Sequence, residues 1–252
     1  MPIHEHAQPD PAGTAPQEAP RRLEPPLVTA VRSLQRRAGN AATLRWLSRD
    51  TDVEHPMPWT DPVPLAALDP AKKSALEKKY TVTVTGPWSA EDFADLERGL
   101  AMLTTKEAGR LSGTTLNRVA SISGGASGLT TVGATKNIDY ADSAFDHGGS
   151  SGGVKRTPLT VNGVPQGQHV VLHECGHVVL YTNSNDTAEK TWNANASKWI
   201  TTDISTQPNG KATAPVEELY CESFACFHTG PDQLKTDAPQ AHAFFKSGKY
   251  LS

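Results

Sequence analysis

The sequence contains little cysteine, few aromatic residues and no long apolar segment, and each shortage excludes a class of protein. Three cysteines among 252 residues are too few for a disulfide framework, which is consistent with folding in a reducing compartment. Since no apolar run reaches about 18 residues, the sequence predicts no transmembrane helix. With 24 basic and 27 acidic residues, the net charge of -3 gives no indication of binding to nucleic acid or to an anionic membrane.

The first residues also lack the apolar segment of a secretory signal peptide. The chain begins Met1-Pro2-Ile3-His4-Glu5, and no apolar stretch of the necessary length follows. We therefore expect the protein to be made in the cytoplasm without a signal peptide.

Proline is concentrated near the N-terminal end, where 11 of the 19 prolines lie within the first 64 residues. Residues 2–26 contain almost no large apolar side chain, so burial cannot offset the conformational entropy that ordering them would remove. We expect three regions. A largely disordered segment with a short amphipathic helix spans 1–50, a proline-rich linker spans 51–68, and one folded domain spans 69–252.

Residues 27–50 combine leucine and valine at helical spacing with five arginines. This pattern is typical of a basic amphipathic helix that lies on a protein or membrane surface. The stretch LQRRAGNAATLRWL, residues 34–47, also resembles a short module in cargo proteins of extracellular contractile injection systems. That resemblance implies that residues 27–50 contact an injection particle, which packages the protein and delivers it to a target cell.

From residue 69 onward, helical and strand patterns alternate along the chain, so we expect an α+β fold. Asp69 and Ser89 are typical helix N-caps, and Thr104 with Glu107 indicates a further short capped turn. Helices are expected over 70–80, 90–103, 168–182, 187–201 and 215–227, and strands over 81–85, 116–121, 136–140 and 158–161.

A His-Glu-x-x-His motif at residues 173–177 indicates a metal site. On a helix, His173 and His177 lie one turn apart on the same face, so both imidazoles can bind one ion. Glu174 points about 100° away around the axis, close enough to contact a water on that ion. Burying these groups without a partner would be costly, so we expect one zinc ion, with Glu174 as the general base.

A catalytic zinc site needs a third protein ligand, and the predicted helix 215–227 offers one. Glu218 and Glu222 lie one turn apart on the same face, and the interleaved apolar residues argue against a solvated surface. We expect Glu218 to be the third ligand and Glu222 to accept a hydrogen bond from a ligating imidazole.

These two motifs together resemble the zinc peptidase domain of anthrax lethal factor and its relatives. The resemblance covers about residues 69–249 and rests on His173-Glu174-x-x-His177 followed by Glu218-x-x-x-Glu222-x-Phe224. It implies a gluzincin: a zincin-like metallopeptidase domain with a helical lower lobe and a small mixed sheet. It also implies peptide-bond hydrolysis.

The chain departs from this family in one respect. The family has a transition-state tyrosine shortly before the ligand glutamate, whereas residues 203–216 contain no tyrosine. An oxyanion donor is nevertheless required. Tyr140, Tyr181, Tyr220 and His169 are all candidates for that donor.

The sequence thus predicts a zinc-dependent endopeptidase toxin or effector that hydrolyses a protein of a target cell. One alternative is a structural or interaction protein of the injection particle, in which zinc only stabilises the fold. Another is an intracellular peptidase whose N-terminal segment is an inhibitory prosegment.

Overall fold

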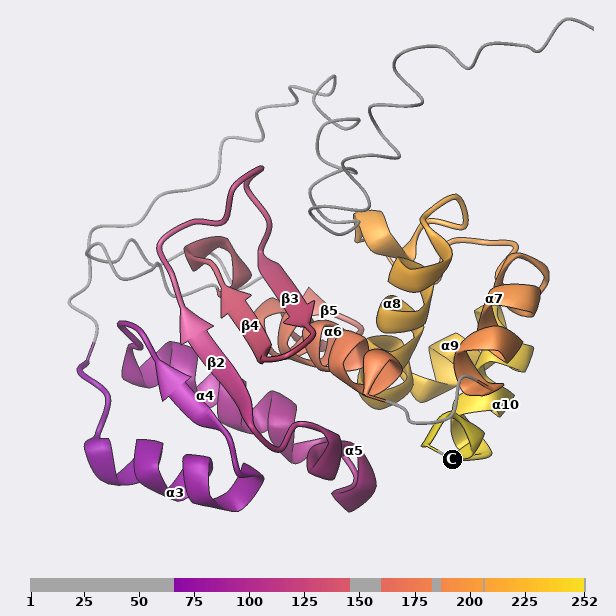
Figure 1. Cartoon of the computed structure of the whole chain (residues 1–252). Coiled ribbons are helices and arrows are strands. Elements are labelled where there is room, and N and C mark those ends of the chain that lie inside the picture. The colour runs from indigo at the N-terminus through magenta and orange to yellow at the C-terminus, as the bar shows by residue number, and fades with distance from the viewer. Residues whose placement is uncertain (1–65, 146–159, 183–186, 206, 252) are drawn as a thin grey trace, which may run out of the picture.

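The computed structural model describes residues 66–145, 160–182, 187–205 and 207–251 (Figure 1). Within them the chain forms eight α-helices and a small mixed sheet, so the expected α+β class is confirmed. None of the helices in these ranges has the length and apolarity needed to span a membrane. The predicted delivery segment over 1–50 and residues 51–65 of the predicted linker lie outside the described residues.

The elements follow one another from residue 70 to residue 251. The helices are α3 (Pro70–Tyr80), α4 (Ala90–Ala101), α5 (Thr105–Arg110), α6 (Gln166–Tyr181), α7 (Thr187–Trp199), α8 (Val216–Thr229), α9 (Pro231–Asp237) and α10 (Pro239–Lys246). The strands are β1 (Thr83–Thr85), β2 (Thr114–Arg118), β3 (Gly128–Val132), β4 (Lys136–Tyr140), β5 (Thr160–Val161) and β6 (Val164–Pro165). Three short 3-10 helices are η1 (Asp142–Ala144), η2 (Pro208–Gly210) and η3 (Lys249–Leu251).

Local signals account for the first helix boundaries. Asp69 and Ser89 each accept a hydrogen bond from a backbone N–H of the helix that follows, as predicted. Thr104 and Glu107 form the reciprocal contacts of a capping box at the start of α5. All five predicted helices are confirmed, with each end within two residues of its expected position.

The predicted strands are less accurate. The strand expected over 81–85 begins only at Thr83, because Thr81 has a φ of 54° and ends α3 in the left-handed conformation. The strand expected over 116–121 runs from Thr114 to Arg118, and the strand over 136–140 is confirmed. Of the strand expected over 158–161, residues 160 and 161 form β5 and the first two lie outside the described residues.

The larger sheet has the strand order β1-β2-β4-β3. β1, β2 and β4 are parallel, whereas β3 pairs with β4 in the antiparallel direction and forms one edge. Val84, Leu116 and Ile138, at the centres of the three parallel strands, are fully buried. They anchor the sheet in the hydrophobic core.

Helix α6 lies in the middle of the fold, between the sheet with α3–α5 and the helices α7–α10 (Figure 1). It contacts α4 and β3 on one side and α8 on the other. Gly176 allows α8 to approach closely, because a Cβ at this position would lie 3.1 Å from the Cα of Cys221. The glycine inside the His-Glu-x-x-His motif therefore brings the acidic residues of α8 within reach of the histidines.

A buried carboxylate joins the short helix α5 to the C-terminal part of the chain. Glu107 is fully buried, lies 2.9 Å from His228 Nε2 of α8 and accepts a hydrogen bond from the Tyr250 hydroxyl. Burial alone would raise the pKa of Glu107, but His228, Tyr250 and the backbone of Thr104 together lower it to about 2. Glu107 is therefore ionised at neutral pH and links the two halves of the domain.

Candidate metal centre

The three predicted ligands, His173, His177 and Glu218, meet between α6 and α8. Their potential ligand atoms all lie within 4.8 Å of one another, and all three side chains are buried. His173 Nε2 lies 3.2 Å from one Glu218 oxygen, and His177 Nε2 lies 3.8 Å from the other. The Nε2 atoms of both imidazoles thus face the same carboxylate.

Each imidazole is also held through its other ring nitrogen. His173 Nδ1 lies 3.0 Å from Glu222 Oε2, which is the contact that the sequence predicted for Glu222. His177 Nδ1 lies 3.4 Å from Glu217 Oε1, a contact not predicted from the sequence although Glu217 directly precedes a predicted ligand. Because a carboxylate only accepts hydrogen bonds, each Nδ1 acts as the donor in its contact, and this orientation of the rings directs Nε2 toward Glu218.

The charges of the site are strongly coupled. Burial alone would lower the pKa of His173, but Glu218 and Glu222 raise it well above its ordinary value. Burial opposes ionisation of Glu218 and Glu222, yet the neighbouring imidazoles hold the pKa of both carboxyls below its usual range. The carboxylates of Glu218 and Glu222 therefore carry negative charge next to the imidazoles. Two imidazole nitrogens with one carboxylate are a donor set that suits Zn²⁺.

Glu174, the predicted general base, is buried and faces the edge strand β3. Its Oε2 accepts a hydrogen bond of 2.7 Å from Thr130 Oγ1. A Cβ at Gly128 would lie 2.3 Å from Glu174 Oε1, so this strand tolerates the carboxylate only because position 128 has no side chain. Burial alone would lower the pKa of His177, but Glu217, Glu218 and the negative charge of Glu174 raise it.

The four candidate oxyanion donors lie in different environments. Tyr140 and Tyr220 are fully buried and pack edge-on against tryptophans of the core. His169 is also buried, with Nε2 2.9 Å from Glu222 Oε1. Tyr181 is 43% exposed, and its ring stacks on that of His177 with centroids 6.4 Å apart. Of the four, Tyr181 alone is both exposed and in contact with a predicted ligand.

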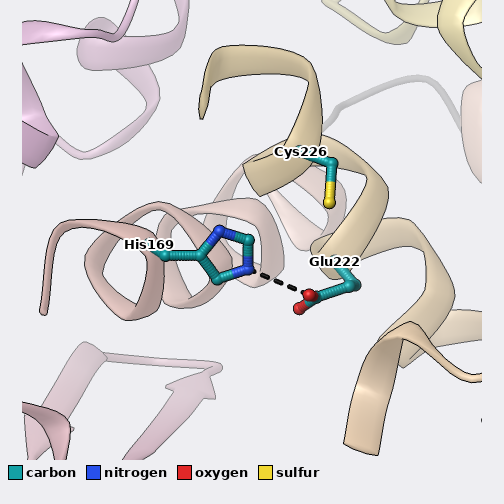
Figure 2. Close-up of side chains that lie close together, drawn as sticks. All are labelled: His169, Glu222 and Cys226. Carbon is teal, nitrogen blue, oxygen red and sulfur yellow. Dashed lines mark hydrogen bonds and ion pairs between the residues drawn. The ribbon is translucent and has the colours of Figure 1, made fainter. Parts of the chain in front are cut away.

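A second group of potential ligands, His169, Glu222 and Cys226, adjoins the first through the contact between Glu222 and His173. Figure 2 shows the His169 ring of α6 directed toward Glu222 on α8, with Cys226 one turn further along that helix. The same Glu222 oxygen also accepts a hydrogen bond of 2.5 Å from Ser205 Oγ, and the Cys226 thiol lies 3.2 Å from Asn162 Nδ2. Protein partners therefore satisfy this group, which holds Glu222 in place without requiring an ion.

Asn209 also reaches the site, although its place there was not predicted from the sequence. It lies in η2, shortly before α8, with Nδ2 3.4 Å from His173 Nε2. A single asparagine between a proline and a glycine is typical of a turn, so no local signal indicated a role in chemistry.

Sequence comparison matches the chain to no protein-family model and to no curated protein. The arrangement of the residues themselves is therefore the basis for a function. In the described part of the chain, that arrangement is a cluster of two imidazoles and one carboxylate able to hold a divalent ion, with further carboxylates around it.

Proposed function

We propose that this protein is a zinc-dependent endopeptidase with a zincin-like fold, in which His173, His177 and Glu218 hold the ion. The observation that carries the proposal is the convergence of these three ligand atoms within 4.8 Å of one another. Glu174 lies on the same helix as the two histidines. Three protein ligands leave one coordination position for water or substrate, as catalysis requires.

When bound, zinc supplies Lewis acidity, polarising the scissile carbonyl and lowering the pKa of water toward about 7. Glu174 takes the proton of the attacking water and later passes it to the leaving amine. Thr130 orients the Glu174 carboxylate by its hydrogen bond to Oε2. Glu217 and Glu222 orient the two imidazoles through their Nδ1 atoms.

The proposed biological role is that of a toxin or effector that cleaves a protein of a target cell. It is supported by the resemblance of residues 34–47 to the cargo module and by that of the two motifs to the lethal factor-like peptidases. In this role the protein is made in the cytoplasm, packaged through residues 27–50 and delivered by the injection particle.

The proposal is tested by identifying newly formed protein termini in a target-cell lysate treated with zinc-loaded protein. The variants are Glu174→Gln and, as a matched control, Glu97→Gln at an exposed position of α4. The wild-type and control proteins should generate a shared set of new termini, and the Glu174→Gln variant should not, although it still binds zinc. An identical set from the Glu174→Gln variant would contradict an enzymatic role.

The burial of the cluster favours a second candidate function, in which the bound metal only stabilises the fold and the protein is not an enzyme. Glu218 is 1% exposed and the two histidines are less than a tenth exposed, as is common at structural metal sites. Tight zinc binding without cleavage of any protein in the lysate would support this candidate.

A further inference from the structure

The loop that carries Asn209 is fixed in position by its own hydrogen bonds. Ile204 N donates to Gly210 O over 2.8 Å, and the Asp203 carboxylate accepts from Ala212 N over 3.0 Å. Ser205 ties the same loop to Glu222, the residue that orients His173. The first two bonds close the loop on itself, and the third holds it against the site.

Within the described residues, the Asn209 side chain has one contact at hydrogen-bond distance, between Nδ2 and His173 Nε2, which lie 3.4 Å apart. This nitrogen is the atom that the proposed zinc ion would bind. Because metal binding uses the lone pair of Nε2, it frees the Asn209 amide to bond to whatever occupies the open coordination position. An amide N–H is a neutral donor that does not titrate, and its hydrogen bond strengthens as a carbonyl oxygen becomes an oxyanion.

The other candidates are less suitable for this task. The hydroxyls of Tyr140 and Tyr220 are fully buried in the core, and His169 is bonded to Glu222 on the side away from the ligands. The Tyr181 hydroxyl bonds to Glu217, which in turn contacts His177 Nδ1. Tyr181 therefore supports the position of a ligand, and its hydroxyl is already engaged.

We propose that Asn209 is a catalytic residue whose side-chain amide donates a hydrogen bond to the oxyanion formed during peptide hydrolysis. This inference rests on the proposed function. It places the donor on a short turn before the ligand glutamate, in the segment where this chain has no tyrosine. Asn209 is not itself a zinc ligand, because zinc in proteins takes cysteine, histidine and carboxylate groups.

The test compares Asn209→Ala and Asn209→Asp with Asn193→Ala, a control at an exposed position of α7. Zinc affinity is measured by competition with a chelator. Acetohydroxamic acid, which presents an anionic oxygen at the metal, is titrated into the zinc-loaded proteins. The aspartate variant keeps the size of the side chain but has no N–H to donate.

For both Asn209 variants we expect acetohydroxamic acid to bind at least about 10-fold more weakly, because a hydrogen bond to a charged group is lost. Zinc affinity of Asn209→Ala should stay within about 3-fold of wild type. On a peptide that the protein cleaves, kcat should fall about 10²-fold with little change in KM, as for loss of one oxyanion donor. The Asn193→Ala control should match wild type in every measurement.

Unchanged acetohydroxamic acid binding in both Asn209 variants would overturn the proposal. A tenfold loss of zinc affinity in Asn209→Ala would also overturn it, because Asn209 would then be a ligand. A lower kcat in Tyr181→Phe with an unchanged kcat in Asn209→Ala would overturn it as well. If wild-type protein cleaves no peptide, the proposed function fails and with it a catalytic role of Asn209, whereas the zinc and acetohydroxamic acid measurements still decide whether Asn209 donates to an anionic oxygen at the metal.

Discussion

Replacing Glu107 with glutamine should weaken the domain in a way that depends on pH. Folding lowers the pKa of Glu107 from 4.5 to about 2, because His228 and Tyr250 stabilise its charge in spite of burial. The difference is about 2.5 units, and at 1.36 kcal/mol for each unit it corresponds to at most about 3 kcal/mol. Because the folded-state pKa is depressed, this stabilisation is complete above pH 4.5 and is lost as the pH falls from about 4.5 to 2.

The assay is urea unfolding of the wild-type and Glu107→Gln proteins at pH 7, 5, 4 and 3. Glutamine does not titrate, so the difference in the free energy of unfolding should be constant above pH 5 and shrink progressively below it. The Glu97→Gln variant, at an exposed position, should differ from wild type by no more than about 0.5 kcal/mol throughout. An equal difference between wild type and Glu107→Gln at pH 7 and pH 3 would refute the reasoning.

Three further predictions concern the metal centre. Glu222→Gln should weaken zinc binding about 10- to 100-fold in a chelator competition, because His173 loses its charged partner, whereas Glu97→Gln should not. Gly128→Ala should lower peptidase activity at least about 10-fold with little change in zinc content, because the new methyl group displaces the Glu174 carboxylate; normal turnover would contradict this contact. Zinc at 1,000 times its Kd should stabilise the fold by about 4 kcal/mol in thermal unfolding, and an unchanged Tm would exclude binding to the folded protein.

The sequence predicted the features that depend on residues close together in the chain. Helix caps, the helical spacing of apolar residues and the one-turn separations of His173 from His177 and of Glu218 from Glu222 are all local patterns. That α6 and α8 pack together, with these two pairs facing each other, was expected only from the chemistry of the residues. The described structure has this arrangement, whereas zinc binding stays a prediction.

The features that the sequence did not predict depend on contacts between distant residues. Glu107 and Tyr250 are 143 positions apart, so nothing near either residue indicates their hydrogen bond. The edge strand β3 consists of glycine, leucine, two threonines and valine, and it lies in a glycine-rich stretch where strand propensity is weak. Asn209 acquires its position from the fold of the loop around it, which no pattern of residue types specifies.

The contacts of His173 have a consequence for how α6 and α8 align. Glu218 and Glu222, one turn apart on α8, contact the two ring nitrogens of His173, Nε2 and Nδ1 respectively. A one-residue insertion between them would rotate one carboxylate by about 100° around the helix axis, so both could no longer reach the ring. The two contacts can therefore form together in only one alignment of α6 and α8. A change in the spacing of the two glutamates along α8 would break at least one of the contacts with His173.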